Sequence, residues 1–272
     1  MPAVRWESRD GASAIATLQG AHLVSWKPVG GEECLYVSER SPFEAGRAIR
    51  GGVPIVFPQF ADRGPLAQHG FARTQPWSFE GTDESHEGYG ASFALQGSPQ
   101  TMALWPHPFR LVFSARIAGT RLDMQLRIVN TGDAAFDFAA ALHTYFRVAD
   151  AAATHLHGLR GTRCTDRGSS AVDVEPREVI SAAEPIDRVY FAAPARVRVE
   201  TPERVLHIGQ RGFTDTVVWN PGVDRTARMA DMPPDGFRYM LCVEAAAIEP
   251  RVALAPGDTW TAVQSIQVRW PA

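Results

Sequence analysis

Apolar and polar residues alternate along two neighbouring stretches, residues 109–118 and 121–130, which are separated only by Gly119 and Thr120. In the second stretch the apolar side chains fall on one face and the polar side chains on the other, as in a half-buried strand. The pattern therefore predicts an antiparallel hairpin. Its buried face should carry Leu122, Met124, Leu126 and Ile128.

Short apolar runs separated by turns continue along the rest of the chain. No stretch keeps a helical period over three turns, and only residues 44–49 and 221–229 favour a turn or two of helix. A regular succession of strands and turns is typical of an antiparallel sandwich. Because no low-complexity linker interrupts it, we expect one all-β domain over residues 1–272, a large antiparallel β-sandwich. Further strands or connections are predicted at residues 13–18, 22–27, 33–37, 77–80, 90–95, 136–148, 158–166, 171–180, 195–200, 205–210, 216–220, 238–244, 252–254 and 260–269.

Residues 47–73 break this pattern. An apolar run at residues 53–60 contains Pro54 and Pro58, which exclude a central strand or a helix interior because proline lacks a backbone donor. Glycines and polar side chains flank the run. The segment therefore predicts a rigid irregular loop that holds cationic and amide side chains for binding. A surface crossover with solvated arginines explains the same residues equally well.

Composition and charge narrow the classes of function. A hydrophobic content of 45% allows a full core, and a net charge of −3 argues against general nucleic-acid binding. Three cysteines without metal-ligand spacing suggest a reducing compartment. The N-terminal residues lack the pattern of a secretory signal, and no apolar run is long enough to span a membrane. We therefore expect a soluble cytoplasmic protein, and a rigid sandwich is compatible with a monomer.

Two ionisable residues lie inside apolar runs. His143 stands in the sequence AALHTYFRV, where a hydrogen-bonded core histidine is the simpler explanation for one histidine alone. Glu244 stands in YMLCVEAAAI, and a buried glutamate needs a cationic partner or has a raised pKa suited to proton transfer. For Glu244 we favour a functional role. Asp187 and Asp215 lie at strand entrances, where an aspartate is more often a turn former.

Other catalytic signatures are missing from the sequence. The histidines show no metal-ligand spacing, and the sequence holds no nucleophile elbow, phosphate-binding P-loop or dinucleotide fingerprint. An acid/base enzyme without a cofactor and a plain binding module both remain. As a carbohydrate-binding module, the protein would use tryptophans as stacking platforms. The candidates are Trp26, Trp77, Trp105, Trp219 and Trp260.

Several motifs, taken in order, resemble the aldose 1-epimerase (galactose mutarotase-like) superfamily, and more closely its hexose-6-phosphate mutarotase branch. They are RGGVPIVFPQF, GPLAQHGFAR, LHTYFRV, IDRVY, DTVVWNP and CVEAAAIEPRVALAPGDTW. The resemblance runs from about residue 15 to the C-terminus and implies an antiparallel β-sandwich. It also implies that the enzyme interconverts the α and β anomers of a sugar phosphate without a cofactor.

The resemblance also implies roles for single residues. His143 matches the catalytic histidine and Glu244 the catalytic glutamate, and we expect a protonated imidazole as the acid and a charged carboxylate as the base. The positions that match substrate contacts are Arg50, Gln68, Arg73 and Asp187, with Arg50 and Arg73 as a phosphate clamp. His69 is added because it neighbours Gln68.

The chain departs from the family pattern at residues 61–63, where Ala61, Asp62 and Arg63 form a charged insert that could change the rim of the site. Between His143 and Asp187 the chain is rich in Ala, Arg and Asp, unlike the family, so the alignment with the family motifs is weakest near Asp187. Two alternatives stay open: an epimerase of unphosphorylated aldoses, which would not need the arginine pair, and a carbohydrate-binding sandwich, which would not need Glu244.

Overall fold

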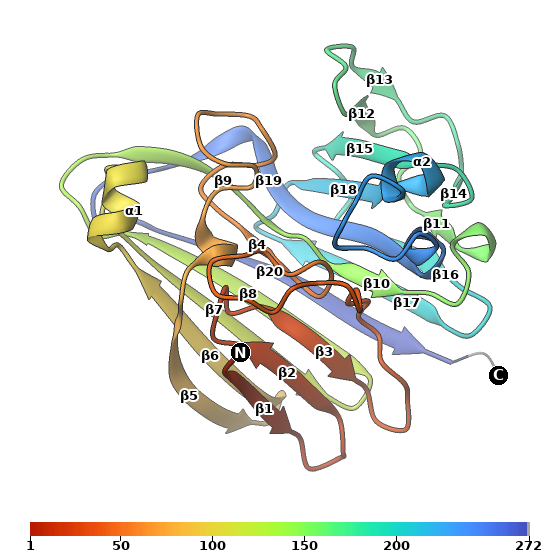
Figure 1. The fold of residues 1–272 in the computed structure, drawn as a ribbon, viewed down its shortest axis with the longest axis horizontal. Helices are drawn as coiled ribbons and strands as arrows, with labels where there is room; N and C mark the ends of the chain where they lie inside the picture. The colour runs from red at the N-terminus through yellow and green to blue at the C-terminus, as the bar shows by residue number, and fades with distance from the viewer. Residues whose placement is uncertain (271–272) are drawn as a thin grey trace.

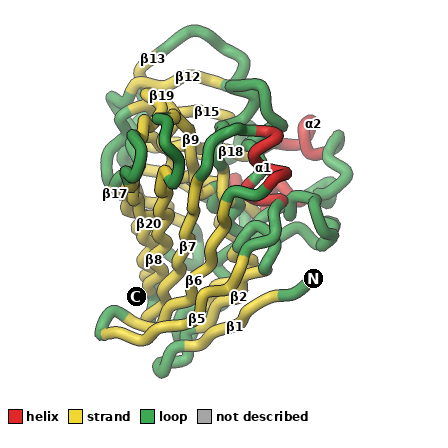
Figure 2. The backbone as a smooth tube through the Cα atoms, turned by 90° about the vertical axis from the view of Figure 1, so that its left-hand side faces the viewer, coloured by secondary structure: helices red, strands yellow, loops and turns green. Residues whose placement is uncertain are grey.

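The computed structural model describes residues 1–270, and about half of them lie in strands of antiparallel sheets (Figure 1). One nine-stranded sheet has the order β14-β11-β16-β17-β20-β8-β7-β6-β5. Its strands are β5 (Ser78–Ser85), β6 (Gly88–Gln96), β7 (Phe109–Ala118), β8 (Arg121–Asn130), β11 (His155–His157), β14 (Val179–Ser181), β16 (Arg196–Glu200), β17 (Val205–Arg211) and β20 (Thr259–Arg269). Figure 2 shows its long strands running side by side.

A second, eight-stranded sheet carries the parts of the chain with the candidate acid and base. Its order is β13-β12-β15-β18-β19-β9-β4, with β10 paired to β19. A small third sheet has the order β1-β2-β3. The strands of these two sheets are β1 (Ala3–Glu7), β2 (Ser13–Thr17), β3 (Leu23–Lys27), β4 (Ile55–Val56), β9 (Phe136–Leu142), β10 (Tyr145–Arg147), β12 (Arg163–Asp166), β13 (Asp173–Val174), β15 (Ile186–Phe191), β18 (Asp215–Asn220) and β19 (Met240–Leu254).

One apolar core joins the two large sheets. It includes Phe113 and Leu126 from the nine-stranded sheet and Phe138 and Ala245 from the eight-stranded sheet. The strands β7 and β8 pair from Phe109 opposite Asn130 to Ala118 opposite Arg121, which confirms the predicted hairpin. The structure therefore confirms the all-β antiparallel sandwich. Within residues 1–270, no helix combines the length and the hydropathy that crossing a bilayer requires.

Some local predictions were wrong. The short helix α1 (Pro99–Leu104) was not predicted, because six residues are too few to show a helical period. It begins at Ser98, whose side chain accepts a hydrogen bond from the Thr101 backbone in a capping box. Residues 44–49 form no helix, and residues 33–37 make only isolated bridges. The second predicted helical turn exists as α2 (Gly222–Thr226).

The proline-containing run forms only the two-residue strand β4, at the edge of the eight-stranded sheet. This position agrees with the preference of proline for sheet edges. The loop over residues 60–69 ends at Gly70, which pairs with Phe57 in an isolated bridge. Gly70 has φ +69°, and a Cβ added there would lie 2.1 Å from the Phe57 carbonyl oxygen. Only glycine fits this close approach, which holds the end of the loop against Phe57.

Asp215, at the start of β18, has a structural role. Its carboxyl group is fully buried and accepts hydrogen bonds from the backbone N–H groups of Ala192, Ile248 and Glu249 at 3.2, 2.8 and 3.1 Å. The last two groups lie where the pairing of β19 with β9 becomes irregular, between Ala247 and Val252. Asp215 therefore replaces ladder partners that the irregular strand lacks.

Replacing Asp215 by alanine should lower the free energy of unfolding by about 2–4 kcal/mol, because three buried backbone donors lose their acceptor. Asp215→Asn keeps an acceptor oxygen and should lose less. Urea unfolding of both variants measures the difference, and Asp133→Ala, in an exposed turn, is the control. A loss for Asp215→Ala no larger than that of the control would contradict the structural role.

Candidate active site

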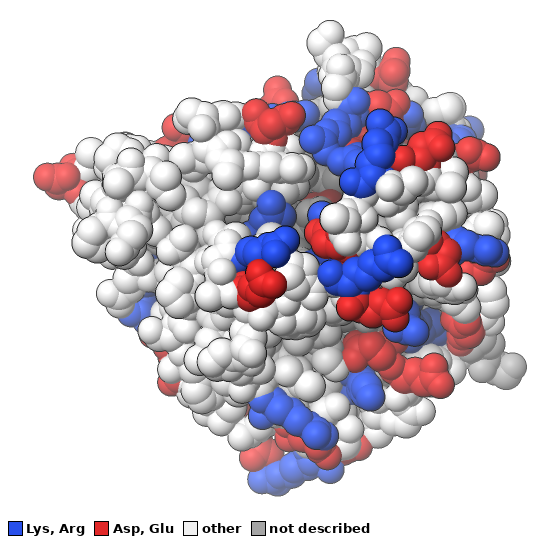
Figure 3. Space-filling view, viewed as in Figure 1, with Lys and Arg blue, Asp and Glu red and all other residues white. Residues whose placement is uncertain are grey.

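A pocket with a cavity volume of about 110 Å³ opens on the eight-stranded sheet under the loop of residues 60–69. The same face of the molecule shows a hollow with arginine side chains gathered around it (Figure 3). Six of the residues predicted from the sequence line the pocket: Arg50, Gln68, His69, His143, Asp187 and Glu244.

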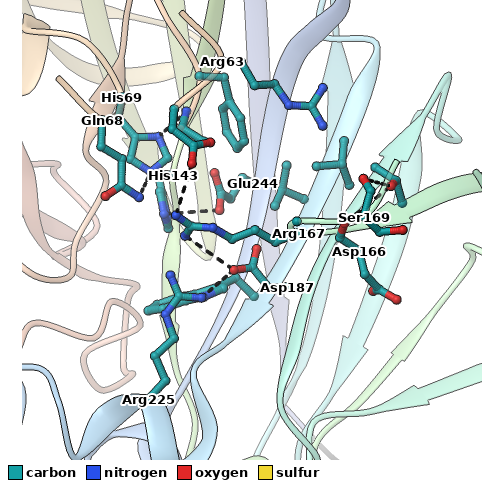
Figure 4. A pocket seen from close by; sticks show the side chains of 18 of the residues that line it. Arg63, Gln68, His69, His143, Asp166, Arg167, Ser169, Asp187, Arg225 and Glu244 are labelled. Atoms are coloured by element: carbon teal, nitrogen blue, oxygen red, sulfur yellow. Dashed lines mark hydrogen bonds and ion pairs between the residues drawn. The ribbon is translucent and has the colours of Figure 1, made fainter. Parts of the chain in front are cut away.

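His143 and Glu244 meet at the floor of the pocket (Figure 4). The His143 Nε2 atom lies 3.3 Å from the Glu244 Oε1 atom, and the two residues are only 6% and 2% exposed. Glu244 belongs to β19, whereas His143 follows directly after β9, so folding brings together two residues that are far apart in the sequence. The contact combines a proton donor and a proton acceptor in one buried place.

Aromatic rings fix the orientation of the His143 imidazole. It stacks on the Tyr145 ring with a centroid distance of 4.7 Å and an interplanar angle of 11°. The edges of Trp219 and His69 approach it at centroid distances of 6.0 and 5.4 Å. These ring contacts hold the His143 Nε2 atom toward Glu244.

Burial shifts the pKa values of this pair in opposite directions. Desolvation lowers the pKa of His143 well below its usual range, and it raises the pKa of Glu244 well above its usual range. The Asp187 carboxylate raises the pKa of Glu244 further, while the Arg73 guanidinium opposes the shift. Both shifts favour the neutral forms. The expectation that the two groups rest as a charged pair stays a prediction, and burial acts against it.

Asp187 is held between two arginines. Its Oδ2 atom accepts a hydrogen bond from the Arg225 guanidinium at 2.5 Å, and an Arg167 nitrogen lies 3.7 Å away (Figure 4). Arg225 also packs over the Trp219 ring at 5.5 Å, which fixes the cation. Asp187 is thus an oriented acceptor on the pocket wall. The pairing of β15 with β18 places it there, at the position that the sequence motif predicted.

Gln68 and His69 come from the loop above the pair. His69 has φ +67°, and its Nδ1 atom accepts a hydrogen bond from the Ala61 backbone N–H group at 3.3 Å. Burial, with help from Arg73, lowers the pKa of His69 to about 3, so the ring is neutral at physiological pH. Gln68 lies beside it, with its Nε2 atom 3.5 Å from the His69 Nε2 atom.

The two arginines of the predicted clamp differ in their surroundings. Arg50 lines the pocket, but its Nε and Nη2 atoms contact Asp231 at 3.1 and 3.0 Å, and its Nη1 atom donates to the Tyr145 hydroxyl at 3.1 Å. Arg73 is not among the lining residues. It donates to the Gln68 carbonyl oxygen at 2.8 Å, and within the described part of the chain its buried Nε atom has no hydrogen-bond partner.

The pocket also contains residues that the sequence did not single out. Arg167 and Arg225 line it, together with Asp166, the last residue of β12, and Ser169 from the connection between β12 and β13. These are polar residues in or near loops, and no pattern distinguishes them from solvated ones. The insert at residues 61–63 does form part of the rim, as its charge had suggested.

The tryptophans give little support to a stacking platform. Trp219 lines the pocket, but Trp26 and Trp77 are buried in the core, and Trp105 and Trp260 pack against that core. Over residues 1–270, no three His, Cys, Asp or Glu side chains form a group suited to a metal ion. The chemical groups that the pocket offers are an acid/base pair, an oriented carboxylate and several guanidinium groups.

Fold and site together define a carbohydrate isomerase of the mutarotase class, and comparison with known proteins gives the family. The model of the family "Aldose 1-epimerase" matches residues 2–267. The chain belongs to the aldose 1-epimerase family, and it is an isomerase that interconverts sugar anomers.

Relatives and solved structures agree with this assignment. A protein of Escherichia coli K12 named "Putative glucose-6-phosphate 1-epimerase" is 38% identical over 241 residues, which cover 86% of this chain and 79% of the relative. A structure titled as a putative mutarotase from Salmonella typhimurium superposes with a TM-score of 0.88 at 34% identity, covering 96% of this chain and 88% of that chain. A galactose mutarotase related enzyme from Lactobacillus acidophilus shares the fold, with a TM-score of 0.77 at 15% identity, 98% of this chain and 97% of that chain being covered.

The lowered pKa of His69 predicts how stability depends on pH. The unfolded chain takes up a proton near pH 6.5, whereas the folded protein does so only near pH 3, so acid favours unfolding. At pH 5 the loss from this one residue is about 2 kcal/mol relative to pH 7. His69→Asn, which tolerates the positive φ, should lose about that much less stability between the two pH values.

Urea unfolding at pH 7 and pH 5 checks this prediction. His86→Asn, at an exposed turn, serves as the control and should retain the pH dependence of the wild-type protein. If His69→Asn behaves like this control, the histidine is not held neutral in the fold.

Proposed function

We propose that the protein interconverts the α and β anomers of a hexose 6-phosphate without a cofactor, with Glu244 as the base and His143 as the acid. One observation carries the proposal: the buried contact between His143 and Glu244 lies in a pocket whose wall and rim are rich in arginine. The name of the Escherichia coli relative, "Putative glucose-6-phosphate 1-epimerase", supports the choice of substrate.

The reaction opens and recloses a hemiacetal. Glu244 takes the proton from the anomeric hydroxyl while His143 gives a proton to the ring oxygen, and the bond between that oxygen and the anomeric carbon breaks. Rotation about the adjacent carbon–carbon bond turns the other face of the aldehyde toward the ring hydroxyl. Reclosure then returns both protons, with the two residues in reversed roles.

The lowered pKa of His143 and the raised pKa of Glu244 are compatible with this reaction. A protonated carboxyl beside a neutral imidazole and a carboxylate beside an imidazolium contain the same number of protons, so one transfer between Glu244 and His143 converts them. Arg73 favours the carboxylate and Asp187 opposes it. A sugar hydroxyl that donates to Glu244 would favour the charged form, because hydrogen bonds to a carboxylate stabilise it.

The phosphate group would bind to guanidinium groups. The predicted clamp of Arg50 and Arg73 stays a prediction, but Arg50 is already engaged by Asp231 and Tyr145. Arg63 and Arg167 line the pocket, and their guanidinium groups make only ion contacts of 3.6 Å or longer among the described residues. Their unused donors suit phosphate oxygens, so we assign these two arginines to the phosphate.

An epimerase of unphosphorylated aldoses is the second candidate. The acid/base pair and Asp187 would serve both substrates equally well. The guanidinium groups of Arg63 and Arg167 favour the phosphorylated sugar, because their ion contacts with protein carboxylates are long and leave donors for a phosphate.

His143→Asn and Glu244→Gln should each lower kcat by about 10²–10⁴-fold, since each removes one proton transfer. Substrate binding should remain, because other residues hold the sugar. Anomer exchange followed by NMR gives the rate, and calorimetric titration with glucose 6-phosphate gives the affinity. Near-wild-type exchange in either variant would remove that residue from the mechanism.

Arg63→Gln and Arg167→Gln should each raise KM for glucose 6-phosphate by about 10-fold, because each removes a charge-assisted hydrogen bond. Rates with free glucose should change little. Arg121→Gln, on an exposed strand position outside the pocket, is the matched control. Equal efficiency of the wild-type enzyme on free and phosphorylated glucose would favour the second candidate and leave the acid/base pair standing.

A further inference from the structure

The backbone ladder breaks directly behind the acid/base pair. The Val243 N–H group donates to the Thr144 carbonyl oxygen at 3.2 Å. In a continuous antiparallel pair the Thr144 N–H group would donate back to the Val243 carbonyl oxygen. It donates instead to the Leu142 carbonyl oxygen at 2.9 Å, while the His143 N–H group donates to the Pro54 carbonyl oxygen at 3.0 Å. The break separates β9 from β10 and places His143 in the gap.

A side chain from the facing sheet fills this break. Gln264, on β20, donates from its Nε2 atom to the Val243 carbonyl oxygen at 3.0 Å. Its Oε1 atom accepts a hydrogen bond from the Thr144 hydroxyl at 2.6 Å. The amide is 1% exposed and lies between Ala262 and Ile266 on the core-facing side of its strand. One buried amide thus joins β19 to the break between β9 and β10.

We propose that Gln264 is a positioning residue, which sets the separation of His143 and Glu244 without touching the substrate. Its two partners, Thr144 and Val243, are the chain neighbours of the acid and the base. Gln264 does not line the pocket. The inference rests on the proposed roles of that pair, and it adds a residue to which neither the sequence motifs nor the pocket pointed.

Filling the core does not require an amide here. A buried amide without partners is unfavourable, and an apolar side chain of the same length would occupy the space. What an apolar side chain lacks is the ability to hold two particular backbone segments in a fixed relation. Misplacement of a catalytic group by about 1 Å can lower a rate by about 10²-fold, so such a clamp matters for turnover.

Gln264→Met and Thr144→Val each remove the clamp with little change in volume. We expect kcat for glucose 6-phosphate to fall about 10–100-fold while KM changes less than about twofold, because the pocket wall stays intact. Thr144→Ser restores the hydroxyl and should recover most of the activity. Combining Gln264→Met with Thr144→Val should lower kcat little further than either change alone, because both break one unit.

Ile266→Val, two residues along the same buried face, is the control for a purely structural effect. It should leave kcat within about twofold. The clamp is wrong if folded Gln264→Met retains kcat, if Thr144→Ser is as slow as Thr144→Val, or if the control loses as much activity. If Gln264→Met does not fold, the Thr144 series decides alone.

The test also separates this inference from the proposed function. If His143→Asn and Glu244→Gln retain activity, the acid/base assignment fails and the clamp has nothing to position. If those two variants are inactive while Gln264→Met is fully active, only the clamp fails.

Discussion

The buried contact between His143 and Glu244 is the interaction on which the rest of the site depends. Two groups that could carry charge are kept almost entirely from solvent, and neither has a full ion-pair partner elsewhere in the pocket. Burial of isolated charges would be strongly unfavourable, and the fold avoids this by favouring the neutral forms. The nearby aromatic rings and the two large sheets hold the distance between the His143 Nε2 atom and the Glu244 Oε1 atom.

Irregularities in otherwise regular strands supply the geometry of the site. His143 lies in the break between β9 and β10, and β19 loses its regular pairing just beyond Glu244. Each irregularity has a buried polar side chain that satisfies the backbone groups left without ladder partners: Gln264 for the first and Asp215 for the second. In a regular sheet, side chains alternate strictly between the two faces. The irregularities near His143 and Glu244 allow these two side chains to meet.

Much of the fold could be predicted from the sequence, because alternation directly reflects which face of a strand is buried. The hairpin of β7 and β8 is the clearest case. His143 and Glu244 were visible for the same reason, since an ionisable residue inside an apolar strand contrasts with its surroundings. The family resemblance then added the pairing of these two residues, which no local pattern contains.

The remainder depends on contacts between distant segments. Nothing around Arg225 predicts that it will hold Asp187, and nothing around Asp231 predicts that it will occupy the donors of Arg50. The desolvation of His143 and Glu244 could not be read from the sequence for a similar reason. Attraction between opposite charges can be inferred from two residue types alone, whereas desolvation depends on how completely the surrounding chain covers them.

These shifts in pKa suit a reaction that runs in both directions. An ordinary histidine binds a proton more tightly than an ordinary glutamate, so one direction of proton transfer between them would be favoured. Burial lowers the proton affinity of His143 and raises that of Glu244, and thereby acts against this preference. Ring opening and ring closure require the same two groups to exchange the roles of acid and base. The low exposure of the pair is therefore part of its chemistry as well as of its packing.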